Sequence, residues 1–130
     1  MPSSRRSDRT TRLNASGGQA AVEFVIVLPL VVVMALGLLV VGIAIRNELA
    51  VEHAAREGAR AASVSATPSV AAGAAARRSV ALPVEVSAVS DRSTVTVTVR
   101  YVDPVDVAIV GSLIGPITHT ASVTMALEPP

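Results

Sequence analysis

An uncharged and strongly apolar run of 22 residues, from Phe24 to Ile45, constrains the fold of this chain more than any other feature. As a helix it would be about 33 Å long, because a helix rises about 1.5 Å per residue. The hydrocarbon core of a bilayer is about 30 Å thick, so the run predicts a transmembrane helix over residues 19–45. The mean hydropathy of the whole chain, +0.57, is also higher than a typical soluble domain has.

The charges before the run predict its orientation. Four arginines and a single aspartate give this segment a net charge of +3: Arg5, Arg6, Arg9, Arg12 and Asp8. Positively charged flanks stay on the cytoplasmic side, so residues 1–18 are predicted to be a cytoplasmic basic leader, with the C-terminus outside. A cleaved signal peptide is a weaker alternative, because its apolar region usually has about 7–15 residues. No aromatic residue interleaves the arginines, so we expect no nucleic-acid partner.

The helical pattern continues beyond the apolar run. Small residues recur every four positions and form a ridge along one side of this stretch, the small-residue ridge: Ala50, Ala54, Gly58 and Ala62. Such a ridge lets another helix or a sheet approach closely. Residues 65–68 predict the end of this helix, with Thr67 capping a second, alanine-rich helix that Pro68 opens. Residues 46–82 are therefore predicted to be an extracytoplasmic helical region.

After residue 82 the period of the apolar residues changes from about four to two. Alternation predicts three strands, the last over residues 117–127, with a hairpin turn at residues 90–93 between the first two. Asp103-Pro104 breaks the second strand and opens a short apolar turn through Val110. Residues 83–130 are thus predicted to be a small antiparallel β region. The fold class is α+β: a long transmembrane helix continuing into an amphipathic helix, a second short helix and a three-stranded antiparallel sheet.

The sequence offers little to catalysis or to metal binding. It has no cysteine, which excludes disulfides and thiolate chemistry. Its two histidines, His53 and His119, fall on different predicted elements, and no HExxH pattern is present. His119 is expected to be half-exposed near the start of the last strand. The serine of residues 111–115 is one position too early for a GxSxG nucleophile motif. We therefore expect no enzyme activity, no metal and no cofactor.

The segment around Glu23 resembles the processing site of type IV prepilins. "GQAAVEFVIVLPL" follows a basic leader and runs into the apolar helix. Three further stretches, "HAAREGARAAS", "TVTVTVRY" and "ITHTASVTMALEP", make the whole similar to TadE-like minor pseudopilins of tight-adherence (Flp) pili. The resemblance implies that a prepilin peptidase cuts between Gly18 and Gln19. Glu23 would then be the fifth residue of the mature chain, followed by the aromatic Phe24; a cut after Gly17 would make it the sixth.

The position of Glu23 has a physical rationale. A carboxylate among apolar helices is tolerated only when it is paired or neutralised. Cutting after Gly18 removes the basic leader and creates an α-ammonium at Gln19. The amine of a neighbouring subunit, shifted along the bundle, can neutralise Glu23 better than its own can. Before the cut, Glu23 lies near the membrane surface, within reach of water and headgroups. The alternative is a glutamate that lies at this surface without any role.

Three functions remain open from the sequence. The resemblance implies a minor pseudopilin in the cytoplasmic membrane, trimmed after Gly18 and assembled through its N-terminal helix into or at the base of a pilus. Its partners would be the prepilin peptidase, other pilin or pseudopilin subunits, the assembly machinery and lipid. The first alternative is an uncut, single-pass accessory protein of a secretion or pilus machine. The second is an exported soluble binding module with a cleaved signal peptide.

Overall fold

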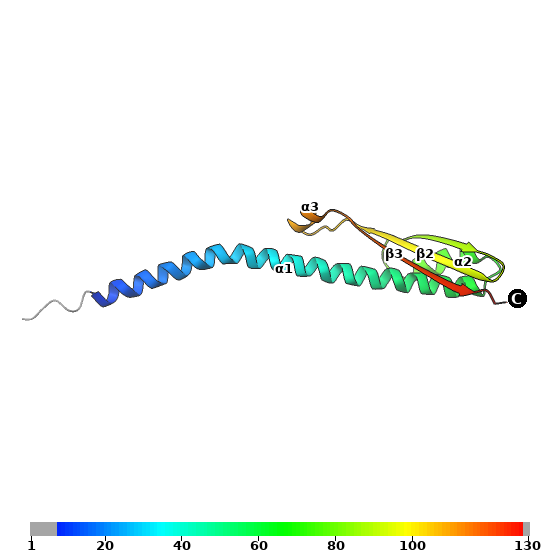
Figure 1. The fold of residues 1–130 in the computed structure, drawn as a ribbon, viewed down its shortest axis with the longest axis horizontal. Coiled ribbons are helices and arrows are strands. Elements are labelled where there is room, and N and C mark those ends of the chain that lie inside the picture. The colour runs from blue at the N-terminus through cyan, green and yellow to red at the C-terminus, as the bar shows by residue number, and fades with distance from the viewer. Residues whose placement is uncertain (1–7, 129–130) are drawn as a thin grey trace, which may run out of the picture. The chain divides into compact units, whose positions relative to one another are not determined.

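The structure, a computed structural model, describes residues 8–128, with side chains described from residue 18 onward. The arginines and Asp8 of the predicted basic leader thus have side chains outside this described part. The chain divides into two compact units, Met1–Leu38 and Leu39–Pro130. Helix α1 (Asp8–Ser63) contributes residues to both units (Figure 1). Pro29 lies inside it, and the helical assignment continues on both sides of this proline.

The unit Leu39–Pro130 contains the other elements, which are antiparallel strands and two shorter helices. They are α2 (Pro68–Ser79), β1 (Glu85–Ser90), β2 (Thr94–Asp103), α3 (Val110–Ile114) and β3 (Ile117–Ala126). The strands form one sheet in the order β1-β2-β3, and each neighbouring pair is antiparallel (Figure 1). The predicted α+β class, with its long helix, short helix and three-stranded sheet, is confirmed.

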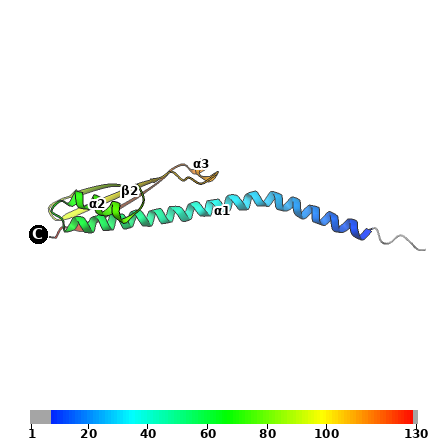
Figure 2. The same ribbon diagram turned by 180° about the vertical axis from the view of Figure 1, so that it is seen from behind.

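One face of the sheet is apolar and buried, and the other is polar. On β2, Val95, Val97 and Val99 are fully buried. The alternate residues bond across to β3 on the exposed face, where Thr98 Oγ1 lies 2.6 Å from Ser122 Oγ. The period-two alternation of the sequence therefore specifies the two faces. Helix α2 packs against β1 and β2 (Figure 2).

The core of this unit is built from valine and alanine. Its largest fully buried side chains are all valines, and the alanines come from α1 and α2. Small side chains let the helices lie close to the sheet, but each one buries little apolar area. The main chain closes the end of this core, because the Glu128 amide donates to the Ser63 carbonyl at 3.0 Å.

The hairpin between β1 and β2 turns at Asp91. Its carboxylate accepts hydrogen bonds from the backbone amides of Ser93 at 2.8 Å and Thr94 at 2.7 Å. These two bonds, with the Thr94 hydroxyl, lower the pKa of Asp91 below its ordinary value, because they stabilise the charged form. The turn lies where the sequence predicted it.

The second helix differs from its prediction in detail. Thr67 occupies the N-cap position, but its side chain makes no capping hydrogen bond, and α2 ends at Ser79. The backbone of Thr67 has ψ of 75°, which is not the β-region conformation of a typical cap. Instead, the Thr67 amide donates to the Ser65 hydroxyl at 3.1 Å.

Candidate functional site

The N-terminal motif lies on α1, within the unit Met1–Leu38. The predicted cleavage residues, Gly18 and Gln19, are helical and exposed, as are Glu23 and Phe24. Gln19 and Glu23 are one helical turn apart, and the Gln19 side-chain amide donates to Glu23 Oε1 at 3.3 Å. Among the residues whose side chains are described, the group that donates to the Glu23 carboxylate is therefore a neutral amide. The structure thus brings Gln19 and Glu23 together, and over the part of the chain with described side chains no cation pairs with the acid.

The space around Gly18 is open. A Cβ atom built at this position meets no atom of another described residue within 4 Å. Packing therefore does not explain a glycine here. Glycine does lower helix stability, by roughly 1 kcal/mol relative to alanine, and so eases local unwinding.

The apolar side chains that follow Glu23 are exposed around the helix. Phe24 is 63% exposed and Ile26 is 70% exposed, and most large apolar residues up to Ile45 are exposed as well, whereas Val40 is buried and Leu36 and Ile43 are partly buried. A helix that is hydrophobic on all sides needs lipid or other helices around it. Over residues 18–63, α1 contains a segment long and apolar enough to cross a membrane, by length and composition.

The small-residue ridge lies on the part of α1 that belongs to the unit Leu39–Pro130. Ala54, Gly58 and Ala62 are buried there, whereas Ala50 is partly buried. A Cβ atom at Gly58 would lie 3.1 Å from Val97 Cγ1 on β2 and 3.2 Å from the Ala72 carbonyl oxygen on α2. The ridge is therefore occupied by the chain's own sheet and second helix.

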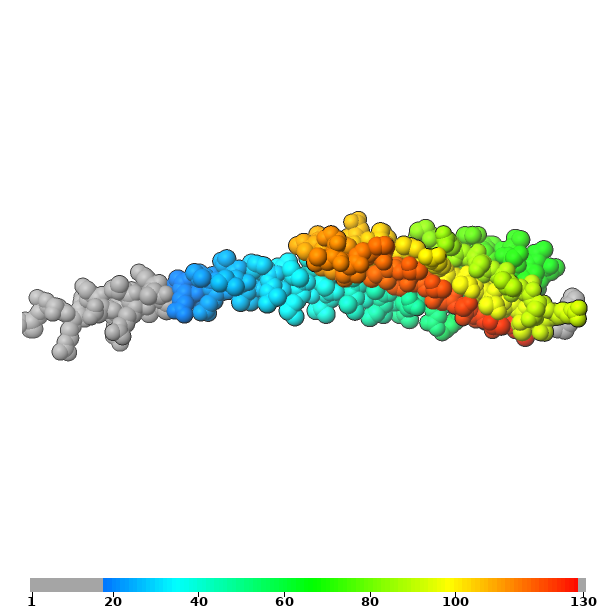
Figure 3. All heavy atoms as spheres, turned by 45° about the horizontal axis from the view of Figure 1, so that its top comes forward, coloured from blue at the N-terminus to red at the C-terminus, as the bar shows by residue number. Residues whose placement is uncertain are grey.

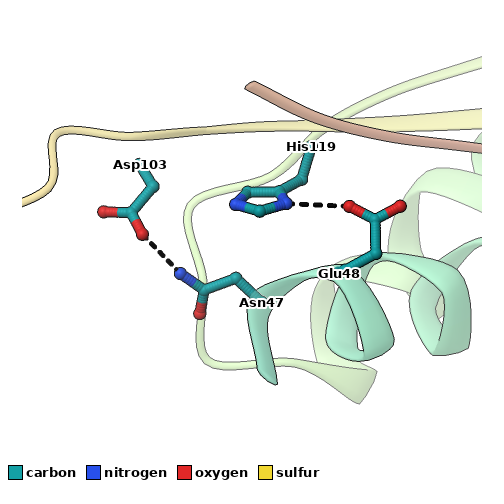
Figure 4. Close-up of polar contacts among 4 residues, drawn as sticks. All are labelled: Asn47, Glu48, Asp103 and His119. Carbon is teal, nitrogen blue, oxygen red and sulfur yellow. Dashed lines mark hydrogen bonds and ion pairs between the residues drawn. The ribbon is translucent and has the colours of Figure 1, made fainter. Parts of the chain in front are cut away.

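A set of four polar residues joins α1 to β2 and β3, and we call it the polar clamp: Asn47, Glu48, Asp103 and His119 (Figure 4). The Asn47 side-chain amide donates to Asp103 Oδ2 at 2.7 Å. His119 Nδ1 lies 2.8 Å from Glu48 Oε2, and it donates because a carboxylate only accepts. Asp103 Oδ1 also accepts from the Val105 amide at 2.9 Å, which fixes the chain just after β2.

The expectation of a half-exposed His119 is wrong. The residue is only 4% exposed, because Glu48 of α1 covers its Nδ1 side and the Tyr101 ring stacks at 6.3 Å between ring centroids. Among the described residues its Nε2 atom has no hydrogen-bond partner. The sequence analysis did not identify the clamp. The signal that could have located it is the period of two, which puts Asp103 on the same face of β2 as the buried valines, where a polar group needs a partner.

The other histidine, His53, is exposed on α1. Among the residues whose side chains are described, no group of three histidine or acidic side chains is arranged to hold a metal ion. The structure shows two arrangements that bear on function. The first is an apolar helix surface with Glu23 near its start. The second is the unit Leu39–Pro130, in which the sheet and α2 pack on the C-terminal part of α1 and the polar clamp bonds the sheet to it.

Comparison with known proteins gives one family. Residues 18–60 match the family described as TadE-like protein, which confirms the resemblance seen in the sequence over this part of the chain. The match begins at Gly18 and includes Glu23 and the small-residue ridge up to Gly58. No curated protein matches the chain. No solved structure matches it either.

Proposed function

We propose that this chain, whose residues 18–60 match the TadE-like family, is a minor pseudopilin of a tight-adherence pilus. The observation that supports this most is Glu23, an acid at the start of an exposed apolar helix, with a neutral amide as its partner among the described residues. The folded unit after Leu38 supports a minor role, because a major Flp subunit consists of little more than the first helix.

The first step is trimming after Gly18 by a membrane aspartyl prepilin peptidase. The Gly18–Gln19 bond lies inside α1, so the helix must unwind there before the peptide bond can reach a catalytic aspartate. Gly17 and Gly18 make this unwinding easier, since each costs a helix roughly 1 kcal/mol relative to alanine. Trimming removes the basic leader from the cytoplasmic side and leaves an α-ammonium on Gln19.

The second step is pairing between subunits. After trimming, the Gln19 ammonium and the Glu23 carboxylate of one chain are separated along the helix by about 6 Å, at about 1.5 Å per residue. A neighbour displaced by about one turn places its ammonium beside Glu23. This pairing sets the axial register, because any other displacement leaves both charges alone among apolar side chains, which is costly. The apolar surface from Phe24 onward supplies the packing.

This role is structural and not catalytic. The partners are the peptidase, other pilin and pseudopilin subunits, the assembly machinery and the lipid around the span. Residues from Arg46 onward lie outside the cytoplasmic membrane in this topology, as the basic leader predicts.

Replacement of Glu23 tests the pairing. Glu23→Ala keeps the span apolar and so should insert and be trimmed normally, yet its incorporation into pilus fractions should fall at least several-fold, because the Gln19 ammonium then has no acid to meet. Incorporation is measured as the share of the protein that co-purifies with sheared pili or cross-links to pilin subunits. Glu52→Ala is the control, since Glu52 pairs with Arg56 on the same helix. Wild-type incorporation of Glu23→Ala would contradict the mechanism.

A further inference from the structure

We propose that the loop around α3, residues 107–117, is a second membrane contact that inserts into the outer interfacial layer of the bilayer beside the transmembrane helix. This loop connects β2 and β3 at the end of the sheet away from the C-terminus (Figure 1). The proposal goes beyond pilus assembly and requires only that the apolar part of α1 spans a membrane.

The loop is apolar in both sequence and exposed surface. From Val107 to Ile117 it contains no charge, and Ser112 is its one side chain with a polar group. Ile109, Leu113 and Ile114 are 56%, 78% and 55% exposed. Loop tips of soluble domains are usually polar, so three large exposed apolar side chains within six residues indicate a surface that is covered by something else.

The loop lies beside the part of α1 that enters the membrane. A cavity of about 200 Å³ next to the loop is lined by two acidic residues, Asp103 and Asp106, and by four apolar ones: Val40 and Ile43 from α1, and Val105 and Val107 from the segment after β2. All six belong to the unit Leu39–Pro130, and Figure 3 shows the atoms around α3, in orange, against the cyan part of α1. Val40 and Ile43 are members of the apolar run that ends at Ile45.

This position corresponds to a definite depth. Val40 and Ile43 precede the end of the apolar run by about 8 Å and about 3 Å along the helix, at about 1.5 Å per residue. Amphipathic elements that lie in a membrane interface bury their apolar face by about 5–10 Å. The loop therefore lies at the level of the interface when the run spans the bilayer. Neighbouring α1 residues such as Leu39 and Val41 are exposed too, so α1 also presents apolar surface at this level.

The backbone of the loop suits a poorly hydrated environment. The Gly111 amide donates to the Val107 carbonyl at 2.8 Å, and the Gly115 amide donates to the Gly111 carbonyl at 3.0 Å. The Ser112 hydroxyl donates to the Ile109 carbonyl at 2.7 Å. Groups bonded in this way cost little to remove from water, whereas unpaired ones cost several kcal/mol. Asp106 is exposed at the start of the loop and limits how deeply it can insert.

Lipid is the occupant that the structure favours over a protein partner. The loop has no charged residue between Val107 and Ile117 that a protein partner could pair. Exposed apolar residues on α1, such as Leu39 and Val41, belong to the run that is proposed to lie in lipid. A folded loop with its own hydrogen bonds also needs no partner strand to satisfy its backbone.

Tryptophan fluorescence tests the proposal, because the chain contains no tryptophan. Full-length Leu113→Trp is reconstituted in phosphatidylcholine vesicles with or without bromine atoms on the acyl chains. Leu30→Trp in the span is the positive control, and Val89→Trp, at an exposed site on β1, is the negative control. Ile114→Trp is a second reporter in the loop, should Leu113→Trp disturb the fold.

The proposal predicts that Leu113→Trp and Leu30→Trp emit at shorter wavelength and are quenched several-fold more by the brominated lipid than Val89→Trp. Emission from both loop reporters that is quenched no more than that of Val89→Trp, while Leu30→Trp is quenched, would overturn it. A blue-shifted but unquenched loop would also overturn it and would indicate that protein covers the loop, which in this sample means a second copy of the chain. Quenching does not require trimming after Gly18, so this result is independent of the proposed pilus function.

Discussion

At the scale of single residues, the packing of α1 against the sheet and α2 in the unit Leu39–Pro130 requires small side chains on α1. Gly58 is a close contact between α1 and the rest of the core, because a Cβ atom there would meet both α2 and β2. Fully buried alanines extend this contact along α1, among them Ala55 and Ala59. Close-packed interiors respond to the addition of even one methylene, so the ridge is sensitive to larger residues.

Gly58→Val should lower the free energy of unfolding of this unit by about 1–3 kcal/mol, because the added carbons overlap Val97 and the Ala72 carbonyl. Chemical denaturation of the full chain in detergent measures the change. Gly73→Val is the matched control, since a Cβ atom there meets only the end of the flexible Arg77 side chain. Equal stability of Gly58→Val and the wild type would show that α1 is not packed as described.

At the scale of secondary structure elements, the polar clamp joins α1 to the ends of β2 and β3. Its bonds run between residues that are far apart in the sequence, such as Asn47 with Asp103 and Glu48 with His119. Since Asn47 and Asp103 are both buried, each needs the other to satisfy its polar atoms. The clamp therefore fixes where the strands lie along this part of α1.

Asp103→Ala should destabilise the unit by about 1–3 kcal/mol for each buried donor left without an acceptor, namely the Asn47 amide and the Val105 backbone amide. Denaturation in detergent, followed by circular dichroism, gives the value. Asp106→Ala removes an exposed carboxylate three residues further on and should change stability by less than about 0.5 kcal/mol. If the two variants lose equal stability, the clamp does not stabilise the fold.

The Asp91 turn should make the stability of the hairpin depend on pH. Its pKa is lowered in the folded chain, so the unfolded chain binds more protons in acid and stability rises with pH. The contribution is complete above the ordinary aspartate pKa, about 3.9, and is lost as the pH falls through the lower folded value. The Tm of Asp91→Ala should therefore differ from that of the wild type at pH 7 more than at pH 3. A difference independent of pH would contradict this.

The sequence predicted the elements better than the contacts between them. Alternation along β2 and β3 gave the strands, the polar face and the turn at Asp91, because a period of two is a local property. The polar clamp could not be located, since Asn47 is 56 residues from Asp103 and only the packing of α1 on the sheet brings them together. For the same reason His119 was expected to be half-exposed, and the occupants of the small-residue ridge remained unspecified.

At the scale of the whole molecule, the two units have different requirements. The unit Leu39–Pro130 has its own core of valine and alanine and its own polar contacts. Most of the described apolar side chains of Met1–Leu38 are exposed, and lipid or neighbouring helices must cover them. In the proposed function, lipid covers these side chains before assembly and neighbouring helices cover them in the pilus. Glu23 must be neutralised in the bundle of helices, and the proposed pairing with a neighbour's ammonium does this.

The N-terminal residue of the protein extracted from the membranes of its host tests this account most directly. Intact-mass measurement and N-terminal sequencing should find Gln19 as the first residue. Gly18→Leu should retain the leader, whereas Gly37→Leu, at another glycine with open space around it, should be trimmed as usual. A wild-type protein that still carries its arginine-rich leader would contradict the account, because the ammonium that Glu23 is proposed to meet would never form.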